Sequence, residues 1–401
     1  MNKQAEILLK LLSRSLFDQK IELQSENWED VLQEAKLQTV VQLAFAGINK
    51  SMLSADDLQK WEAASASVIA NNIRIIHNHE LLHKWMSESE IPYVVLKGCA
   101  SASYYPIPVY RNMGDVDFLV PSDKLKQAGK ALESNGLKPW NEEHIAHIVY
   151  RKDGMHLEMH FNVAGLPEGK AGETVREYLA DIFQQSALHK TENGEMVFPS
   201  PFHHGLVLLL HTCHHMTGEG IGLRHLCDWA VFVNSFSDKE FCDLFEEKLK
   251  AVGLWKFAKV LTAISIKYLG VNQKQWAQSD ESLVDKLMED ILSGGNFGIK
   301  EVGRGLQTML ISDRGKNGVG HTSMQSQFVH SVNNVVRHHW PKAKNHPALL
   351  PAGWVYFGGR RIIREMTGKR RKTNVSKLVE DSSRRRDLYS QLHLYESEPD
   401  E

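Results

Sequence analysis

The 401-residue chain has few cysteines, no long apolar run and no excess of either charge. Its cysteines form no Cys-x-x-Cys pair and are too sparse for a disulfide scaffold; they are Cys99, Cys213, Cys227 and Cys242. We therefore expect a reducing, cytoplasmic location. No uncharged stretch reaches the roughly 18 apolar residues that indicate a membrane-spanning helix, so no transmembrane segment is expected.

The charge balance limits the partners that the chain as a whole can bind. Lys and Arg total 47 and Asp and Glu total 49, which gives a net charge of −2. This balance argues against a globally basic nucleic-acid-binding protein, so any charged partner must be bound by a local patch. The sequence also has no Walker-type glycine-rich phosphate loop, which argues against an ordinary ATPase or kinase.

The composition is that of a globular protein, with 42% hydrophobic and 24% charged residues. At roughly 100–200 residues per domain, the length allows two or three structural units. We expect a helical segment at residues 1–90, an α/β core at 91–200, a helical domain at 201–350 and a basic segment at 351–401. Residues 293–322 are rich in Gly and Ser and predict a loop.

The core segment alternates between strand-like and helix-like runs. In order they are IPYVVLKG at 91–98, CASASYY at 99–105, MGDVDFLV at 113–120, a helix between Ser122 and Asn135, and the strands HIAHIVYRK and MHLEMHF joined by Asp153-Gly154. Asp-Gly between two apolar runs is a strong hairpin signal. This order predicts an α+β fold in which helices flank a small mixed sheet.

Two carboxylates are set into the second of these strands. Residues i and i+2 of a strand point to the same face, so Asp115 and Asp117 are expected to converge while Val116 and Phe118 enter the core. Two like charges this close repel each other unless a cation lies between them. Mg²⁺ suits such a pair, because it binds one or two carboxylates together with phosphate oxygens. The ordinary alternative is an aspartate in a turn or helix cap.

A third acidic residue occupies the last strand of the core. Its alternation places Glu158 on one face with His156 and His160. If this strand lies beside that of Asp115, Glu158 joins the pair over the same spot. Three carboxylates holding one or two metal ions are the arrangement required for in-line phosphoryl or nucleotidyl transfer.

These motifs resemble a known family. Lys97-Gly98, a short helix with Tyr-Tyr-Pro, and then Arg-x-Met-Gly-Asp-x-Asp-x-Leu-Val resemble the uncharacterised nucleotidyltransferases of bacteria, a branch of the polymerase-beta-like superfamily. LEMHF and GIGLRHLCDWAVF, farther along the chain, are also similar to this family. The resemblance covers roughly residues 90–235.

The resemblance implies a polymerase-beta-like core that moves a nucleoside monophosphate from an NTP to an acceptor and releases pyrophosphate. It implies that Asp115, Asp117 and Glu158 are catalytic and bind Mg²⁺ or Mn²⁺. The implied nucleotide-binding residues are Lys97, Gly98, Arg111 and Gly114. The acceptor stays open among sugars, small metabolites, tRNA and protein.

One position departs from the superfamily pattern. The residue after the glycine is usually Ser, whose hydroxyl helps to hold phosphate, but here it is Cys99. A first alternative is therefore a nucleotide- or partner-binding protein that keeps the fold and has lost catalysis.

Histidines suggest a second alternative. His211 and His215 are four apart on an expected helix, which is a metal-ligand spacing, although the Glu of His-Glu-x-x-His is missing. They could serve a His-centred metallohydrolase, contact substrate together with His160, or simply pack against the sheet. Arg224 and Asp228 are also four apart and are expected to form an intrahelical ion pair.

The C-terminal segment is rich in arginine. Basic clusters follow Trp354, Tyr356 and Phe357, and they are Arg360-Arg361, Arg364, Lys369-Arg370-Arg371-Lys372 and Arg384-Arg385-Arg386. Such a segment could touch anionic lipid or RNA. The plainer interpretation is a solvated terminal face.

Overall fold

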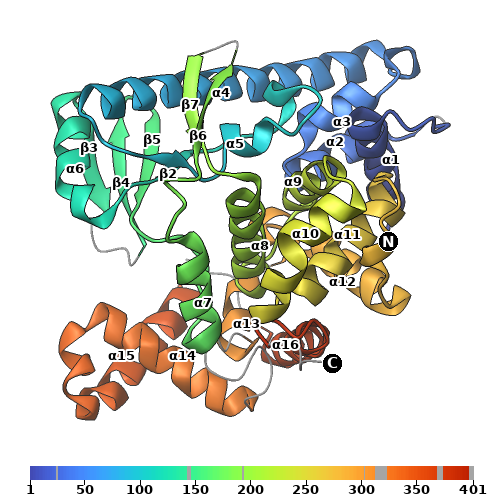
Figure 1. Ribbon diagram of the computed structural model, residues 1–401. Coiled ribbons are helices and arrows are strands. Elements are labelled where there is room, and N and C mark those ends of the chain that lie inside the picture. Colours follow the sequence, from blue (N-terminus) through green and yellow to red (C-terminus); the bar gives the residue numbers. More distant parts are fainter. Residues whose placement is uncertain are drawn as a thin grey trace.

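The computed structural model describes residues 1–23, 26–141, 146–191, 194–301, 303–311, 323–367 and 374–396. Helices make up most of the fold, and a five-stranded sheet and a two-stranded sheet lie toward one side of it (Figure 1). The α+β class expected from the sequence is therefore confirmed. Among the described helices, none combines the length and the hydrophobicity needed to cross a lipid bilayer.

The N-terminal part of the chain is helical. Its helices are α1 (Lys3–Phe17), α2 (Trp28–Leu37), α3 (Val41–Gly47) and the long α4 (Ala55–Glu88), which extends from this group across the sheet (Figure 1). The side chains of Asn2, Asn27 and Ser54 accept hydrogen bonds from first-turn amides, which fixes where α1, α2 and α4 begin.

The larger sheet has the strand order β1-β2-β5-β4-β3. Its strands are β1 (Val94–Val95), β2 (Val116–Leu119), β3 (Lys138–Asn141), β4 (His147–Lys152) and β5 (Met155–His160). β2 and β5 run parallel and the other neighbours run antiparallel, so the sheet is mixed, as predicted. The short helix α5 (Cys99–Ala102) follows β1, and α6 (Leu125–Ser134) follows β2.

The two faces of this sheet differ sharply in polarity. Val116 and Phe118 of β2 are fully buried in an apolar cluster with residues of α4 and α6, as the alternation predicted. The opposite face carries Asp117, which lies directly beside Glu158 of β5 in the parallel register. The sequence-based expectation that the two acidic strands are neighbours is therefore confirmed.

Two hairpins were expected. Asp153 and Gly154 join β4 to β5 with φ of 45° and 80°, the left-handed conformation that a tight two-residue hairpin turn requires. β6 (Ala187–Thr191) and β7 (Gly194–Phe198) pair antiparallel, as predicted, although the expected turn residue Asn193 lies outside the described residues. β3 was not expected, because its sequence KPWN contains proline and shows no alternation.

The rest of the chain is helical. The helices are α7 (Gly169–Leu179), α8 (Pro201–Thr217), α9 (Leu223–Asn234), α10 (Asp238–Ala251), α11 (Trp255–Leu269), α12 (Glu281–Gly294), α13 (Arg304–Ile311), α14 (Met324–His339), α15 (Leu350–Met366) and α16 (Val375–Ser390). Short 3₁₀ helices occupy Lys50–Met52, Pro108–Tyr110, Ser122–Lys124, Gln275–Ala277, Asn296–Gly298, Pro341–Lys344 and Pro347–Leu349.

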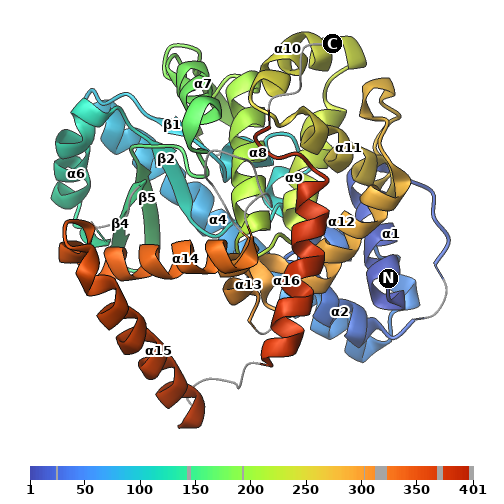
Figure 2. The same ribbon diagram turned by 90° about the horizontal axis from the view of Figure 1, so that it is seen from below.

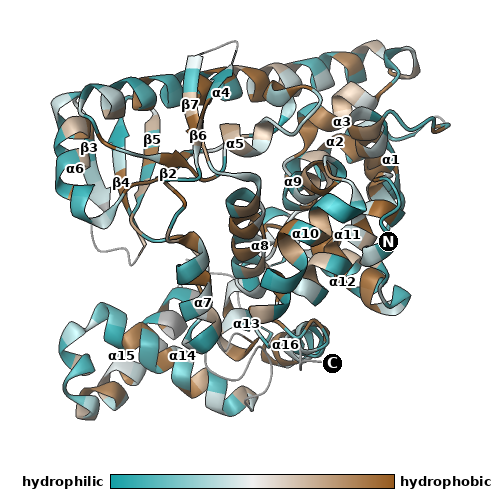
Figure 3. Ribbon diagram, in the orientation of Figure 1, coloured by the Kyte–Doolittle hydropathy of each residue, from teal (hydrophilic) through white to brown (hydrophobic). Residues whose placement is uncertain are grey.

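One hydrophobic core crosses the segment boundaries expected at residues 90, 200 and 350. It joins Leu8 of α1, Leu119 of β2, Leu209 of α8 and Leu392 near the C-terminus. Hydrophobic residues follow much of α8, which lies between the sheet and the other helices (Figure 3). The sheet and the helices on its polar side are therefore held together by apolar packing.

The loop predicted at residues 293–322 is wrong for one stretch, because Arg304–Ile311 is helix α13. Arg304 is buried and its guanidinium lies 2.6 Å from Asp290 Oδ2 and 2.8 Å from Glu301 Oε2. These ion pairs anchor a segment whose glycine-rich composition suggested irregular structure. Residues 312–322 lie outside the described part of the chain.

The basic C-terminal segment is only partly a solvated face. α15 leads away from the body of the molecule and α16 returns to it (Figure 2). On α16, Arg385 is buried and donates hydrogen bonds to Gln307 Oε1 at 2.7 Å and to the backbone oxygen of Met216 at 3.0 Å. Arg384 beside it is exposed. The basic run at 369–372 lies outside the described residues.

We expect Arg385→Ala to destabilise the fold by about 2–4 kcal/mol, because it removes a buried cation with several hydrogen bonds. Arg384→Ala removes an exposed charge and should change stability by less than about 0.5 kcal/mol. Urea unfolding of the two variants beside the parent chain measures the difference. Equal midpoints would show that α16 is not held through Arg385.

Candidate active site

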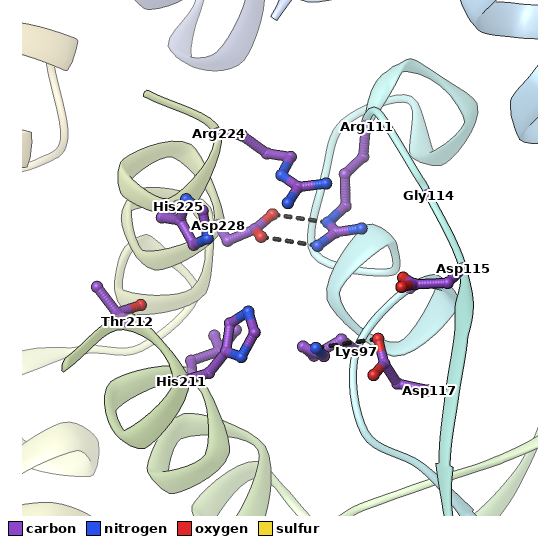
Figure 4. A pocket seen from close by; sticks show the side chains of 12 residues that line it. Lys97, Arg111, Gly114, Asp115, Asp117, His211, Thr212, Arg224, His225 and Asp228 are labelled. Atoms are coloured by element: carbon purple, nitrogen blue, oxygen red, sulfur yellow. Dashed lines mark hydrogen bonds and ion pairs between the residues drawn. The ribbon is translucent and has the colours of Figure 1, made fainter. Parts of the chain in front are cut away.

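A pocket lies between the polar end of β2 and the helices α8 and α9 (Figure 4). Its volume is about 450 Å³, including the part open to solvent, and its lining is largely polar. The lining residues are Lys97, Gly98, Arg111, Gly114, Asp115, Asp117, Leu208, His211, Thr212, Arg224, His225 and Asp228. The pocket thus brings together all four expected nucleotide-binding residues and two of the three expected carboxylates.

The two aspartates lie where β2 begins. Asp115 directly precedes the strand, Asp117 is its second residue, and the intervening Val116 enters the core. The Asp117 side chain is 3% exposed and is held from two sides. Lys97 Nζ lies 3.0 Å from its Oδ2, and His160 Nε2 lies 2.9 Å from its Oδ1.

These surroundings separate the pKa values of the two carboxyl groups. Burial acts to raise the pKa of Asp117, but the Lys97 charge and the His160 hydrogen bond outweigh it and hold that pKa well below its usual range. Repulsion from Asp117, together with burial, raises the pKa of Asp115 to about 6. The pocket therefore holds one firmly ionised carboxylate beside a second that is costly to ionise.

Gly98 occupies the sharp turn between β1 and α5. Its φ is +53°, and a Cβ on it would lie 2.8 Å from His79 Nε2, so both backbone conformation and space require glycine. Cys99 beside it is buried, and burial raises the pKa of its thiol to about 12. Cys99 does not line the pocket, so its side chain does not take the place of the serine expected after the glycine.

Arg111 lines the pocket but is already engaged. Its Nε and an Nη donate to the two carboxylate oxygens of Asp228, each at 2.7 Å, and the Tyr105 hydroxyl donates to the same carboxylate at 2.6 Å. Asp228 therefore pairs with Arg111 across the pocket, where the sequence had suggested a pair with Arg224. This bidentate bond ties the segment before Asp115 to α9.

Arg224 is a pocket cation that sequence reasoning did not assign to the site. Its Nε–H is buried without a hydrogen-bond partner, and burial together with the nearby Arg111 charge lowers its pKa. His225 and Thr212 line the same wall. In the sequence, Arg224 belongs to the motif GIGLRHLCDWAVF. The sequence alone did not show that this helix lies opposite the sheet.

The two candidate metal ligands of α8, His211 and His215, are half-buried. Burial lowers the pKa of His211 far below its ordinary value and that of His215 to about 2. Their rings are 4.3 Å apart, and His215 packs against Phe297. His211 reaches the pocket but His215 does not. Within the described ranges, neither joins a group of three donors close enough for one metal ion.

Glu158 lies on the strand next to Asp117, but its carboxylate is close to His147 and His160. It neighbours Asp117 in the register, yet its Oε2 lies 3.6 Å from His147 Nε2 and 3.6 Å from His160 Nε2. Glu158 and His160 do not line the pocket. The expected three-carboxylate cluster is therefore arranged as a pair, with the third member one strand away.

The half-buried Asp115 and the buried Asp117 together have the donor chemistry of a divalent cation site. Both offer carboxylate oxygens, and repulsion from Asp117 is the main reason why the pKa of Asp115 is raised. A hard cation between the two carboxylates would reduce this repulsion. Lys97 supplies part of that compensation in the structure.

This site belongs to an α+β protein in which two aspartates at the start of a strand face a polar pocket closed by helices. The model of a family described as "Uncharacterised nucleotidyltransferase" matches residues 24–270, which is more than half of the chain. The chain therefore belongs to this nucleotidyltransferase family. No curated protein and no solved structure matches the chain.

We expect Asp115→Asn to stabilise the metal-free fold at pH 7.5. The raised pKa means that the folded state binds a proton more tightly than the unfolded state, so stability falls as pH rises from 3.8 to about 6. Removing the charge should recover up to about 3 kcal/mol above pH 6 and nothing below about pH 4.

Asp117→Asn should act in the opposite direction. Its pKa is depressed, so its contribution is present at neutral pH and is lost on acidification; the variant should lose about 1–3 kcal/mol at pH 7.5. Chemical unfolding in a chelator at several pH values measures both variants. Destabilisation by Asp115→Asn at pH 7.5 would contradict the described charge arrangement.

Proposed function

We propose that this protein is a metal-dependent nucleotidyltransferase that transfers a nucleoside monophosphate from an NTP to an acceptor and releases pyrophosphate. The observation that carries the proposal is the convergence of Asp115, Asp117, Lys97 and Arg224 on one pocket of a family member. We further propose that the core is polymerase-beta-like.

In this proposal, Asp115 and Asp117 hold Mg²⁺ or Mn²⁺, and Glu158 supports them from the neighbouring strand. The ion would neutralise charge on the triphosphate and lower the pKa of an acceptor hydroxyl. Because the pKa of Asp117 is strongly depressed, this residue offers an ionised oxygen at any pH at which the enzyme works.

The pocket cations would bind the triphosphate. Lys97 lies 3.0 Å from Asp117 and would contact phosphate oxygens if a bound metal ion took over its pairing with that carboxylate. Arg224 comes from the opposite wall and has a buried, unpartnered Nε–H. Arg111 acts instead as a positioning residue, since its guanidinium is already bonded to both oxygens of Asp228.

Gly98 and Gly114 both line the pocket, and the backbone of Gly114 is exposed there. A Cβ on Gly114 would meet no atom within 4 Å, so this position is open on the pocket side. The phosphates would therefore be bound by backbone groups and cations. A serine hydroxyl at the position of Cys99 would not be needed. Catalysis would come from positioning and charge neutralisation.

Loss of catalysis with retention of nucleotide binding is the second candidate, and the buried thiol of Cys99 is the observation that favours it. The acceptor is proposed only as a class, a hydroxyl-bearing sugar, metabolite, tRNA or protein. Binding and transfer measured on the same sample separate the two candidates.

We expect Asp115→Asn and Asp117→Asn each to lower nucleotidyl transfer by about 100-fold or more, because each removes charge compensation that the transition state requires. The measurement is label transfer from each α-labelled NTP with Mg²⁺ or Mn²⁺ and cell extract. Asp123→Asn, at an exposed carboxylate beyond β2, is the matched control and should keep full activity.

Lys97→Ala and Arg224→Ala should weaken NTP binding, and they separate binding from chemistry. Transfer that persists in both aspartate variants would remove the proposal. NTP binding without any transfer in the parent chain would favour the degenerate binding protein.

A further inference from the structure

Three donors on the polar face of the sheet form a second cluster, outside the pocket. His147 of β4 lies directly opposite His160 of β5, and Glu158 is two residues before His160 on the same face. Their nearest ligand atoms all lie within 4.8 Å of one another. All three residues come from paired strands, so their separation is fixed by the sheet rather than by a loop.

The distances suit a shared ion better than hydrogen bonds. Both Nε2 atoms lie 3.6 Å from the same Glu158 oxygen, which is too long for a hydrogen bond. Ligands bound to one tetrahedral ion at about 2.0–2.1 Å are about 3.3 Å apart. Small inward movements would bring the two Glu158–histidine distances to this value, and the two histidines, whose ligand atoms lie within 4.8 Å of each other, would also have to approach.

We propose that His147, Glu158 and His160 form a site for a divalent transition metal, with Zn²⁺ as the best-fitting ion, next to the Asp115–Asp117 pair. With this ion bound, Glu158 would be its ligand and would not support the pair. Two imidazole nitrogens and one carboxylate are a donor set of zinc sites that keep a fourth position open. Mg²⁺ prefers oxygen ligands, so the two sites differ in the metal that they select.

The two sites are connected through one contact. His160 Nε2 forms a hydrogen bond with Asp117 Oδ1 at 2.9 Å, so His160 would have to give up this bond in order to bind an ion through Nε2. The His147 and Glu158 side chains are 15% and 19% exposed, which leaves the open position reachable from solvent. The proposed site thus lies where an ion could tune the carboxylate of the neighbouring pair.

Titration of the metal-free, tag-free chain with Co²⁺ tests this proposal. Tetrahedral Co²⁺ with nitrogen ligands gives visible absorption, so we expect a band that saturates at one ion per chain. Zn²⁺ should abolish the band, whereas a large excess of Mg²⁺ should not. His147→Ala should weaken Co²⁺ binding by at least about tenfold.

Matched variants locate the ion. His156→Ala changes a histidine that lies on β5, like His160, but is outside the cluster. This variant should leave the Co²⁺ absorption band unchanged. Asp115→Asn should also leave it, which separates this site from the proposed nucleotide site. An unchanged band in His147→Ala, a band lost instead in His211→Ala, or no stoichiometric Co²⁺ binding would overturn the proposal. None of these readouts depends on nucleotidyl transfer.

A separate observation concerns α15. Helical spacing places Val355, Tyr356, Ile363 and Met366 on one side of this helix, where they are 77%, 49%, 61% and 78% exposed. The other side packs on α14, where Trp354 contacts Phe328 and bonds Asn333. Arg360 and Arg364 border the exposed stripe.

We infer that α15 binds an anionic lipid surface. A wide apolar stripe beside arginines is the pattern of helices that lie in the membrane interface, where the arginines meet anionic headgroups. The helix leads away from the body of the molecule (Figure 2), and the four apolar side chains of the stripe are exposed. RNA binding would require the arginines but not the apolar stripe.

Sedimentation with vesicles distinguishes these possibilities. We expect the chain to bind phosphatidylcholine vesicles containing phosphatidylserine and not phosphatidylcholine alone. The double variant Val355→Glu/Met366→Glu should lose this binding, whereas Val375→Glu, at an exposed valine on α16, should keep it. No binding to the anionic vesicles, or binding to RNA that the double variant leaves intact, would contradict the inference.

Discussion

The site depends on one electrostatic constraint, the placement of the half-buried Asp115 carboxylate beside the buried Asp117 carboxylate at the beginning of β2. Asp117 is ionised because Lys97 and His160 stabilise its charge. Repulsion from this charge raises the pKa of Asp115. Lys97 and the arginines that line the pocket offset part of this negative charge. A divalent cation is the partner whose charge would complete that compensation, and a triphosphate would bind to this cation and to the pocket cations.

The sheet makes the constraint possible by separating its faces. Val116 and Phe118 anchor β2 in an apolar cluster, which fixes the direction of the alternating aspartates. The bidentate bond between Arg111 and Asp228 then fixes the distance between this edge and α9. The same polar face continues into the histidine cluster around Glu158, so one sheet presents an oxygen-rich site and a nitrogen-rich site side by side.

Much of this could be predicted from local patterns. The alternation in MGDVDFLV and MHLEMHF, with the Asp-Gly turn between β4 and β5, was sufficient to predict a mixed sheet in which Asp117 and Glu158 are neighbours. The direction of the Glu158 carboxylate was not, because it depends on His147, which comes from another strand. Arg224 and the Arg111–Asp228 bond were missed for the same reason, since they join segments more than a hundred residues apart.

The most direct test of the central claim is Mn²⁺ binding in the presence of a non-hydrolysable NTP analogue, followed by electron paramagnetic resonance. The account predicts that the analogue strengthens Mn²⁺ binding in the parent chain and in His147→Ala, and that Asp115→Asn and Asp117→Asn abolish this effect. Analogue-dependent Mn²⁺ binding that is unchanged in both aspartate variants would contradict it.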